Sequence, residues 1–410
     1  MTIRIFISTG EVSGDLQGAL LINALHRQAE KLGQELEIVA LGGSRMAQAG
    51  ANLLADTTKI GSVGILESLP YIWPTLQIQN RAKQYLRQNP PDLVILIDYM
   101  GPNLVIGNFI RSHLTNVPIV YYIAPQVWVW SLSDRDTKQI IKISDLILAI
   151  FPEEARFFGE KGVKVTWVGH PLLDKMIYAP SRSAARASLG IPPEETVITL
   201  LPASRRQELQ YVLPAMLAAA KILQSKIPEV KFLIPLSLEA FRQPIEQAIE
   251  KYNLKASLIA DKNIEAIAAA DLAITKSGTV NLEIALLEVP QVVIYRVNPI
   301  TAWIAKNLFQ FSIPFMSPPN LVLMKAIVPE LLQEQATPEN IVQEAINLMN
   351  PANSSQILAE YQQMRQNLGE VGRVCEKAAQ EIFTLLPLEQ SAEKKTQNFP
   401  HPQNRKIIFP

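Results

Sequence analysis

Two series of short apolar runs, rich in β-branched residues, constrain the fold of this chain more than any other feature. The first series consists of Ile3–Ser8, Glu37–Leu41, Leu93–Ile97, Ile119–Ile123 and Leu146–Ile150. The second series consists of Val197–Leu201, Phe232–Leu236, Leu258–Ala260, Leu272–Thr275 and Val292–Tyr295. Segments with helical periodicity, such as Leu16–Lys31 and Val212–Lys226, separate the runs. Apolar runs that alternate with helices indicate parallel sheets covered on both faces. The chain is therefore predicted to be an α/β protein with two doubly wound, Rossmann-like domains that face each other across a cleft.

The segment Tyr178–Pro193 is rich in Pro, Ser and Gly, which is the composition of turns and linkers. It divides the two series, so we expect an N-terminal domain over residues 1–180 and a C-terminal domain over residues 181–350. A helical pattern follows over residues 351–387, and these helices are expected to pack back on the first domain. The polar residues 388–410 are predicted to form a disordered tail.

Composition excludes several classes of protein. The 410 residues include 38 Lys and Arg and 38 Asp and Glu, so the chain has no basic excess for binding nucleic acid. One cysteine, Cys375, excludes a disulfide framework, and the four histidines form no metal-ligand pair. We therefore expect no metal and no cofactor. No signal peptide and no apolar run of the ~20 residues that span a bilayer is visible, so a soluble, cytoplasmic protein is expected, with contact at a membrane surface left open.

Glycines, a serine and an aspartate follow the first apolar run, in the segment Thr9–Gly18. Its backbone N–H groups are expected at a helix N-terminus, on the sheet edge where ligands of open α/β folds bind. The simpler alternative is a tight turn in which Ser13 or Asp15 caps the helix. The spacing of the glycines differs from the dinucleotide fingerprint, so a hydride-transfer enzyme is not favoured.

Asp98 ends an apolar run that is predicted to be a central strand. A carboxylate at that edge suits a general base, and the alternative is a cap or turn former. After the next run, Pro125, Gln126, Trp128 and Trp130 form an aromatic loop. Such a loop suits sugar stacking or an acyl chain, although aromatic residues more often serve packing.

Two segments of the second half combine hydroxyls with charge after an apolar run. Ser204 and Arg205 suit a phosphate, and the alternative is a capping box from Ser204 to Gln207. The turn Ser277–Thr279 opens a predicted helix, and its exposed N–H groups are expected to hold a diphosphate without a metal. Glu283 lies one turn further on in an apolar stretch, where it needs a partner such as two ribose hydroxyls.

Further polar groups follow in a proline-rich loop and the segment after it. Asn320, Glu330 and Gln333 are suited to hydroxyl, amide or uracil edges. By contrast, Asp134-Arg135-Asp136 matches a metal-binding D-x-D pattern but begins a charged stretch, and a solvated helix face is the better interpretation.

Together these residues resemble the lipid-A-disaccharide synthase family, glycosyltransferases of the two-domain GT-B type. The family's motifs occur in order over residues 5–335: G-E-x-S-G-D-x-x-G at Gly10–Gly18, P-x-x-W-x-W at Pro125–Trp130, G-H-P at Gly169–Pro171, S-R-x-x-E at Ser204–Glu208, S-G-T-x-x-L-E at Ser277–Glu283, Y-R-x-x-P at Tyr295–Pro299, P-N-L at Pro319–Leu321 and V-P-E-L-L-Q at Val328–Gln333. Many members carry a second carboxylate where this chain has Gly101, and Ala203 replaces the glycine of their phosphate loop.

The resemblance implies an inverting transfer that joins UDP-2,3-diacylglucosamine to 2,3-diacylglucosamine 1-phosphate through a β-1,6 bond and releases UDP. Asp98 and Arg205 are then the catalytic residues, with Asp92 as the alternative base. The residues implied for the UDP-sugar are Ser204, Arg205, Ser277, Gly278, Thr279, Glu283, Asn320, Glu330 and Gln333. Those implied for the lipid acceptor are Glu11, Ser13, Gly14, Asp15, Asn103, Gln126 and Trp128.

Acylated substrates also imply a peripheral enzyme on the cytoplasmic side of the inner membrane. Residues 64–86 concentrate apolar and aromatic groups suited to that contact, and packing on their own sheet is the alternative. A homodimer is among the possible assemblies. Two other functions stay open: another GT-B enzyme, such as an undecaprenyl-linked N-acetylglucosaminyltransferase or a UDP-N-acetylglucosamine 2-epimerase, and a non-catalytic lipid- or nucleotide-binding homologue.

Overall fold

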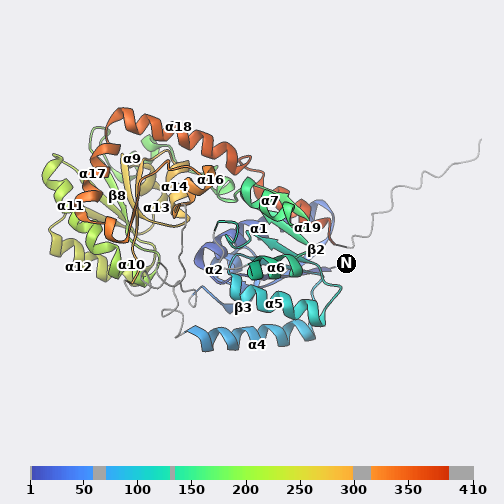
Figure 1. Cartoon of the computed structure of the whole chain (residues 1–410). Helices are drawn as coiled ribbons and strands as arrows, with labels where there is room; N and C mark the ends of the chain where they lie inside the picture. Colours follow the sequence, from blue (N-terminus) through green and yellow to red (C-terminus); the bar gives the residue numbers. More distant parts are fainter. Residues whose placement is uncertain (1, 59–70, 130–133, 299–314, 387–410) are drawn as a thin grey trace, which may run out of the picture.

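The protein forms two parallel β-sheets, each covered by helices (Figure 1). The computed structural model describes residues 2–58, 71–129, 134–298 and 315–386. Within these ranges the seven-stranded first sheet has the order β3-β2-β1-β4-β5-β6-β7, and the six-stranded second sheet has the order β10-β9-β8-β11-β12-β13. The strands are β1 (Thr2–Ser8), β2 (Glu35–Gly42), β3 (Asn52–Asp56), β4 (Leu93–Ile97), β5 (Ile119–Tyr122), β6 (Leu146–Ala149), β7 (Val165–Trp167), β8 (Val197–Leu201), β9 (Lys231–Pro235), β10 (Ala256–Ile259), β11 (Leu272–Lys276), β12 (Gln291–Tyr295) and β13 (Glu330–Leu332).

Helices of the first half cover both faces of the first sheet, and α8 leads out of it. They are α1 (Val12–Lys31), α2 (Ser44–Gln48), α4 (Ile72–Gln88), α5 (Met100–His113), α6 (Asp134–Ile143), α7 (Pro152–Glu160) and α8 (Leu172–Met176). Alternate residues of β1 show why its run is apolar throughout. Ile5 and Ile7 face the core shared with α1, whereas Phe6 faces the core shared with α4 and α5.

The second half repeats this arrangement and ends in the long helix α18 and the shorter helix α19. Its helices are α9 (Arg182–Leu189), α10 (Arg206–Tyr211), α11 (Leu213–Lys226), η2 (Glu239–Phe241), α12 (Arg242–Tyr252), α13 (Asn263–Ala268), α14 (Val280–Leu286), α16 (Pro318–Leu323), η3 (Gln333–Gln335), α17 (Pro338–Leu348), α18 (Pro351–Leu368) and α19 (Val374–Phe383). Helix α9 lies inside the segment that was expected to be a linker. None of the helices in the described ranges is both long and apolar enough to cross a membrane.

The two predicted series of strands, and hence the doubly wound fold class, are confirmed. The sequence did not reveal β3, β7 and β13, each of which lies at an edge of its sheet. Edge strands are short and covered less completely, so they lack the continuous apolar run that marks a central strand.

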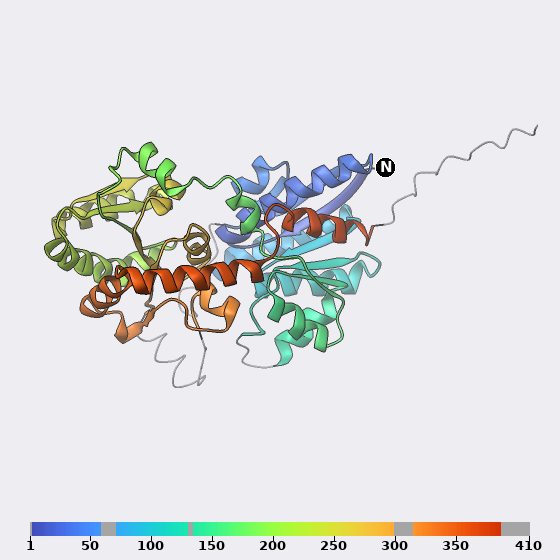
Figure 2. The same ribbon diagram turned by 90° about the horizontal axis from the view of Figure 1, so that it is seen from above.

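The chain passes between the halves twice, once after β7 and once after α18. The two passages meet where Gly169 and His170 contact Leu368. Figure 2 shows α18 extending from the second half to the first, where α19 packs against α1. Gly169 has φ 95°, and a Cβ there would lie 2.6 Å from the carbonyl oxygen of Leu368, so only glycine fits. The His170 N–H donates to the same oxygen at 2.7 Å. The apolar core continues through this region, which fixes how the two sheets sit relative to each other.

His170 of the G-H-P motif has a structural environment. It is buried, and its Nδ1 accepts the N–H of Leu172 at 3.2 Å. Burial lowers the pKa of His170 to about 3, so the ring is neutral at physiological pH. The predicted tail, residues 388–410, lies outside the described residues.

Candidate active site

The order of the strands reverses between β1 and β4 in the first sheet and between β8 and β11 in the second. Ligands of open α/β sheets bind beyond the carboxyl ends of the strands at such a switch point. The four loops that follow these strands are called the interdomain site below, and they contain the main sequence motifs. The Nη2 of Arg205, after β8, lies 2.9 Å from the Oε2 of Glu11, after β1. This ion pair shows that the two sheet edges face each other.

Asp98 occupies a strained turn at the end of β4. Asp98 and Tyr99 have φ 46° and 48°, and Ile123 at the end of the neighbouring strand β5 has φ 59°. Non-glycine residues rarely adopt this conformation, which costs on the order of 1–3 kcal/mol each and concentrates at functional sites. The fully buried Asn103 holds the turn, because its Nδ2 donates to the carbonyl oxygens of Ile97 at 3.0 Å and Asp98 at 2.7 Å.

The electrostatic surroundings of Asp98 raise its pKa to about 7. Burial is the largest cause, and the carboxylate of Glu11 adds to it. A hydrogen bond with the Tyr99 backbone and the charge of Arg205 act in the opposite direction. A carboxyl group with a pKa near the operating pH is suited to accept and release a proton. Asp92, the alternative base, lies at the opposite end of β4, where its Oδ2 accepts the Arg4 N–H at 2.8 Å.

The first motif serves mainly to build the site. A Cβ on Gly10 would lie 1.9 Å from the Tyr99 ring, and one on Gly14 would lie 1.8 Å from the Thr9 Oγ1. Asp15 is buried and accepts N–H groups at the start of α2, including that of Gly43 at 2.8 Å. Asp15 therefore caps a helix, but the helix is α2 rather than its own. Glu11 and Ser13 remain partly exposed.

The aromatic loop after β5 packs on the start of α7. The Trp128 and Phe151 rings are 5.8 Å apart, and the Trp128 Nε1 is buried without a partner among the described residues. Trp130 lies outside the described residues, and Gln126 is partly exposed. No sequence pattern singled out Glu154, whose buried carboxylate accepts the N–H of Ala124 at 3.1 Å and so ties the loop to α7. Burial raises the pKa of Glu154 to about 8 despite three backbone hydrogen bonds.

On the second sheet, Glu208 organises the loop after β8. Its Oε2 accepts the backbone N–H of Ser204 at 2.6 Å and of Arg205 at 3.0 Å. The expectation of a capping box closed by Gln207 was wrong, because α10 starts one residue later and Arg205 is its N-cap. The Arg205 guanidinium is thereby aimed at the other domain.

The turn after β11 differs from the prediction in its backbone. The Ser277 N–H donates to the Ile294 carbonyl at 3.0 Å, and the Gly278 N–H donates to the Asn281 Oδ1 at 2.7 Å. The expectation that the N–H groups of this turn are exposed was wrong for Ser277, which pairs with β12, and for Gly278, whose N–H is bound by the Asn281 side chain. The Thr279 N–H has no acceptor among the described residues. Thr279 is the N-cap of α14 and is partly exposed.

Glu283 has an ion-pair partner that the sequence did not suggest. Its carboxylate contacts the ammonium of Lys175 on α8, which packs against α14. The pair satisfies the expectation that Glu283 needs a partner, with a lysine instead of a ribose.

Asn320 and Glu330 form a buried brace behind this turn. The Asn320 Nδ2 donates to Glu330 at 2.7 Å and to the Val328 carbonyl at 3.0 Å. Glu330 also accepts the Ser317 N–H at 2.8 Å. Gln333 is close by in sequence, and its Oε1 lies 3.4 Å from the Val297 N–H. Gln333 and Glu330 therefore contact Val297 and Ser317, which lie at the two ends of the segment between β12 and α16. The polar atoms of Asn320 are already engaged.

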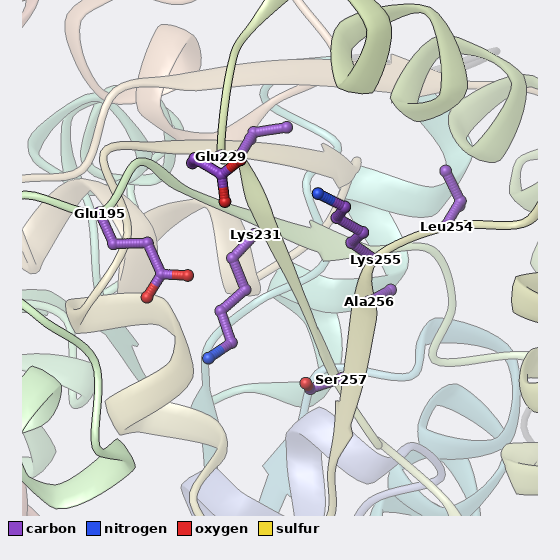
Figure 3. A pocket seen from close by; sticks show the side chains of 8 residues that line it. Glu195, Glu229, Lys231, Leu254, Lys255, Ala256 and Ser257 are labelled. Atoms are coloured by element: carbon purple, nitrogen blue, oxygen red, sulfur yellow. The ribbon is translucent and has the colours of Figure 1, made fainter.

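A separate pocket of about 360 Å³ lies at the amino end of the second sheet (Figure 3). Its lining includes Lys231 at the start of β9 and Ala256 at the start of β10. Because this edge is opposite the switch point, it does not belong to the interdomain site. Asp134 and Asp136 begin α6, and within the described ranges no group of His, Cys, Asp or Glu is placed to hold a metal ion.

Two doubly wound parallel domains that meet at their switch points form the GT-B fold. Two solved structures have this fold over most of their length. They are a putative UDP-N-acetylglucosamine 2-epimerase from Listeria monocytogenes (TM-score 0.64, 15% identity, 92% of this chain and 95% of that one) and the UDP-N-acetylglucosamine 2-epimerase from Neisseria meningitidis bound to UDP-GlcNAc (TM-score 0.63, 14% identity, 94% and 100%). At these identities the likeness shows the fold alone.

Sequence comparison is more specific. Residues 5–385 match the family described as Lipid-A-disaccharide synthetase. Lipid-A-disaccharide synthases from Gloeothece citriformis and Synechocystis sp. are 58% and 59% identical to the chain; each alignment covers 93% of this chain, and 99% and 97% of the relatives. One from Geobacter sulfurreducens is 35% identical over 93% of this chain and 97% of its own. The chain belongs to the lipid-A-disaccharide synthase family, and it is a glycosyltransferase of lipid A biosynthesis. This assignment excludes the alternatives of an epimerase and of an undecaprenyl-linked transferase.

Proposed function

We propose that this glycosyltransferase joins UDP-2,3-diacylglucosamine to 2,3-diacylglucosamine 1-phosphate, with inversion at the anomeric carbon and release of UDP. The observation that carries the proposal is the opposition of Asp98, a carboxyl group with a pKa of about 7, to Arg205 across the interdomain site. One edge then supplies a proton acceptor and the other a positive charge. We also propose that residues 1–180 hold the acceptor and residues 181–350 the donor.

In this mechanism Asp98 takes the proton of the acceptor 6-hydroxyl. The hydroxyl oxygen forms a bond to the anomeric carbon from the face opposite the diphosphate, while the bond from that carbon to the diphosphate oxygen breaks. The departing UDP gains negative charge, which Arg205 stabilises as a forked donor. Most of the rate enhancement comes from positioning and from this electrostatic stabilisation.

On the donor side, some residues are proposed to contact the nucleotide and others to shape the loops around it. Ser204, Thr279 and Glu283 have groups near the interdomain site, and Glu283 is proposed to exchange Lys175 for the ribose hydroxyls. Asn320 and Glu330 are proposed to shape the uridine-binding loop through the brace described above, together with Gln333. Ser277 and Gly278 provide a closed turn against which the diphosphate rests.

The acceptor side divides in the same way. Glu11, Ser13, Gln126 and Trp128 are partly exposed and are proposed to meet the acceptor sugar. Gly14, Asp15 and Asn103 are buried, and their contacts support a role in holding those loops in place.

Exposed apolar residues support contact with a membrane surface. At the start of α4, Tyr71, Ile72, Trp73 and Leu76 are exposed, and Trp73 is 70% exposed. Ile65, Leu66 and Leu69 of the same predicted patch lie outside the described residues. We propose peripheral binding to the cytoplasmic leaflet of the inner membrane through this patch. Liposome co-sedimentation should fall for the Ile72→Glu, Trp73→Glu variant, and undiminished binding by the folded variant would reject the patch.

Turnover by the full chain tests the proposal directly. Incubation with both acylated sugars should release UDP and form the disaccharide, and a chelator should leave the rate unchanged. Binding of both sugars without product would contradict the proposed reaction. Glu283→Ala should raise KM for the donor in a folded protein, and an unchanged KM would remove Glu283 from the donor site.

A further inference from the structure

Lys276 is a buried cation at the centre of the interdomain site. It is the last residue of β11, one of the two strands at the switch point of the second sheet. Its side chain is only 11% exposed. Its Nζ lies over the next turn, since a Cβ on Gly278 would be 2.5 Å from that nitrogen. A larger residue at position 278 would displace the ammonium, so the glycine lets Lys276 occupy this position.

The charge of this ammonium is incompletely matched. Its ion pair with the Oε1 of Glu208 spans 3.7 Å, which is longer than a direct hydrogen bond. The same Oε1 lies 3.8 Å from the Nη1 of Arg205, so one carboxylate oxygen serves two cations. The other oxygen of Glu208 is engaged by backbone N–H groups. A buried ammonium is costly unless it is paired and hydrogen-bonded.

The surroundings indicate an anion as the missing partner. Arg205 reaches a second carboxylate, that of Glu11, but this group belongs to the other domain. Without Glu11, two cations share the single carboxylate of Glu208. The turn beside Lys276 offers fewer free N–H groups than a helix start usually does, because those of Ser277 and Gly278 are engaged. The Lys276 side chain adds positive charge at this point.

We propose that the Lys276 ammonium binds the diphosphate of the nucleotide together with Arg205 and stabilises the charge of the departing UDP. This inference rests on the proposed function and assigns a residue that the motifs did not single out. The two cations complement each other, because Arg205 is a planar fork and Lys276 a compact point charge. The competing explanation is that Lys276 only neutralises Glu208.

Nucleotide binding by the full chain separates these explanations. Lys276→Gln should weaken UDP binding at least tenfold in calorimetry, and the affinity for uridine, which has no phosphate, should stay unchanged in an NMR titration. Lys231→Gln is the matched control. Lys231 is the first residue of β9, so it lies at the amino ends of the strands of the same sheet, away from the interdomain site. It should bind UDP as the wild type does.

The double variant Lys276→Gln, Glu208→Gln completes the test. The amide oxygen that replaces the Glu208 carboxylate can still accept the backbone N–H groups, while the charge that Lys276 is said to neutralise is removed. If Lys276 binds the diphosphate, the double variant stays weak for UDP. Recovery of UDP affinity in the double variant, or less than a twofold loss in Lys276→Gln, would overturn the inference and leave the proposed function intact. Failure of the wild type to bind UDP would instead overturn the proposed function.

Discussion

The carboxyl edges of the two sheets have the same topology but opposite chemistry. The first edge presents the carboxyl groups of Asp98 and Glu11, and the second presents Arg205 and Lys276. The first edge also holds non-glycine residues in left-handed backbone conformations, whereas the turn after β11 uses Gly278 with φ 154°. Three strained residues therefore lie around the proposed proton acceptor, although Met324 and Gln333 of the second domain also have positive φ.

Burial acts on both edges in the direction that favours the neutral form. It raises the pKa of Asp98 to about 7 and lowers the pKa of Lys276. The proposed chemistry needs Asp98 ionised and Lys276 charged. We therefore expect kcat/KM to rise as the pH passes about 7 and to fall again at higher pH, where Lys276 loses its proton. One fold can thus place a base and a cation within one pH window by burying each on its own edge.

The largest effect is expected when the first edge loses its base. Asp98→Asn should lower kcat by about 10³-fold, within the 10²–10⁴ range of general base catalysis, and leave UDP affinity nearly unchanged. Asp92→Asn, at the other end of the same strand, is the control and should keep normal turnover. A rate for Asp98→Asn within tenfold of the wild type would contradict the assignment.

Asp98→Asn should also change how the stability of the protein depends on pH. The folded pKa of Asp98 is raised, so its contribution to stability is present below the unfolded value of about 4 and is lost as the pH rises through about 7. Asp98→Asn removes this loss. Its melting temperature should exceed that of the wild type at pH 8 by more than it does at pH 5.

A somewhat smaller effect is expected when the second edge loses the guanidinium of Arg205. Arg205→Ala should lower kcat by about 10²-fold and weaken UDP binding, because a buried anion loses a charged donor. Arg205→Lys should recover only part of the loss, since a point charge cannot replace a bidentate contact. Steady-state kinetics together with calorimetry on UDP measure both effects. Unchanged UDP affinity in Arg205→Ala would argue against the proposed division between the edges.

Glu11 connects the two edges, and its removal should shift pH dependence more than rate. The Glu11 carboxylate raises the pKa of Asp98, so Glu11→Gln should move the acid limb of the kcat/KM profile to lower pH. The variant also frees Arg205 from its ion pair and should tighten UDP binding. A profile that stays in place would show that Glu11 does not act on the ionisation of Asp98.

The smallest effect is expected at Gly101. This residue lies in the first turn of α5, and a Cβ there would have nothing within 4 Å. Gly101→Asp should stabilise the protein by about 0.3 kcal/mol through helix propensity and by a further ~0.3–1 kcal/mol through the helix dipole. The added carboxylate should move the acid limb to higher pH, opposite to Glu11→Gln. Thermal unfolding and the pH profile of kcat/KM would detect these changes, and a destabilised protein would contradict the space found at this position.

Much of the interdomain site could be predicted because strand ends are visible in the sequence. Asp98 and Arg205 each follow an apolar run, and parallel strands bring such ends to one edge. Lys276 also follows a run, but a lysine there looks like an ordinary charged residue at the end of a strand. Its proposed role depends on its burial over Gly278 and on its ion pair with Glu208. Both contacts are visible only in the tertiary structure.

Periodicity and ordered motifs are local properties of the chain, and they were enough to predict the fold class, the family and the four loops that build the site. Only the folded molecule reveals which polar groups are already engaged, as at Asn103 and Ser277, and which face an unmatched charge. It also shows that Asp92 and Asp98, six residues apart, lie at opposite ends of one strand. Burial, charge and hydrogen bonding depend on neighbours that are distant in the chain, and these neighbours come together only when the chain folds.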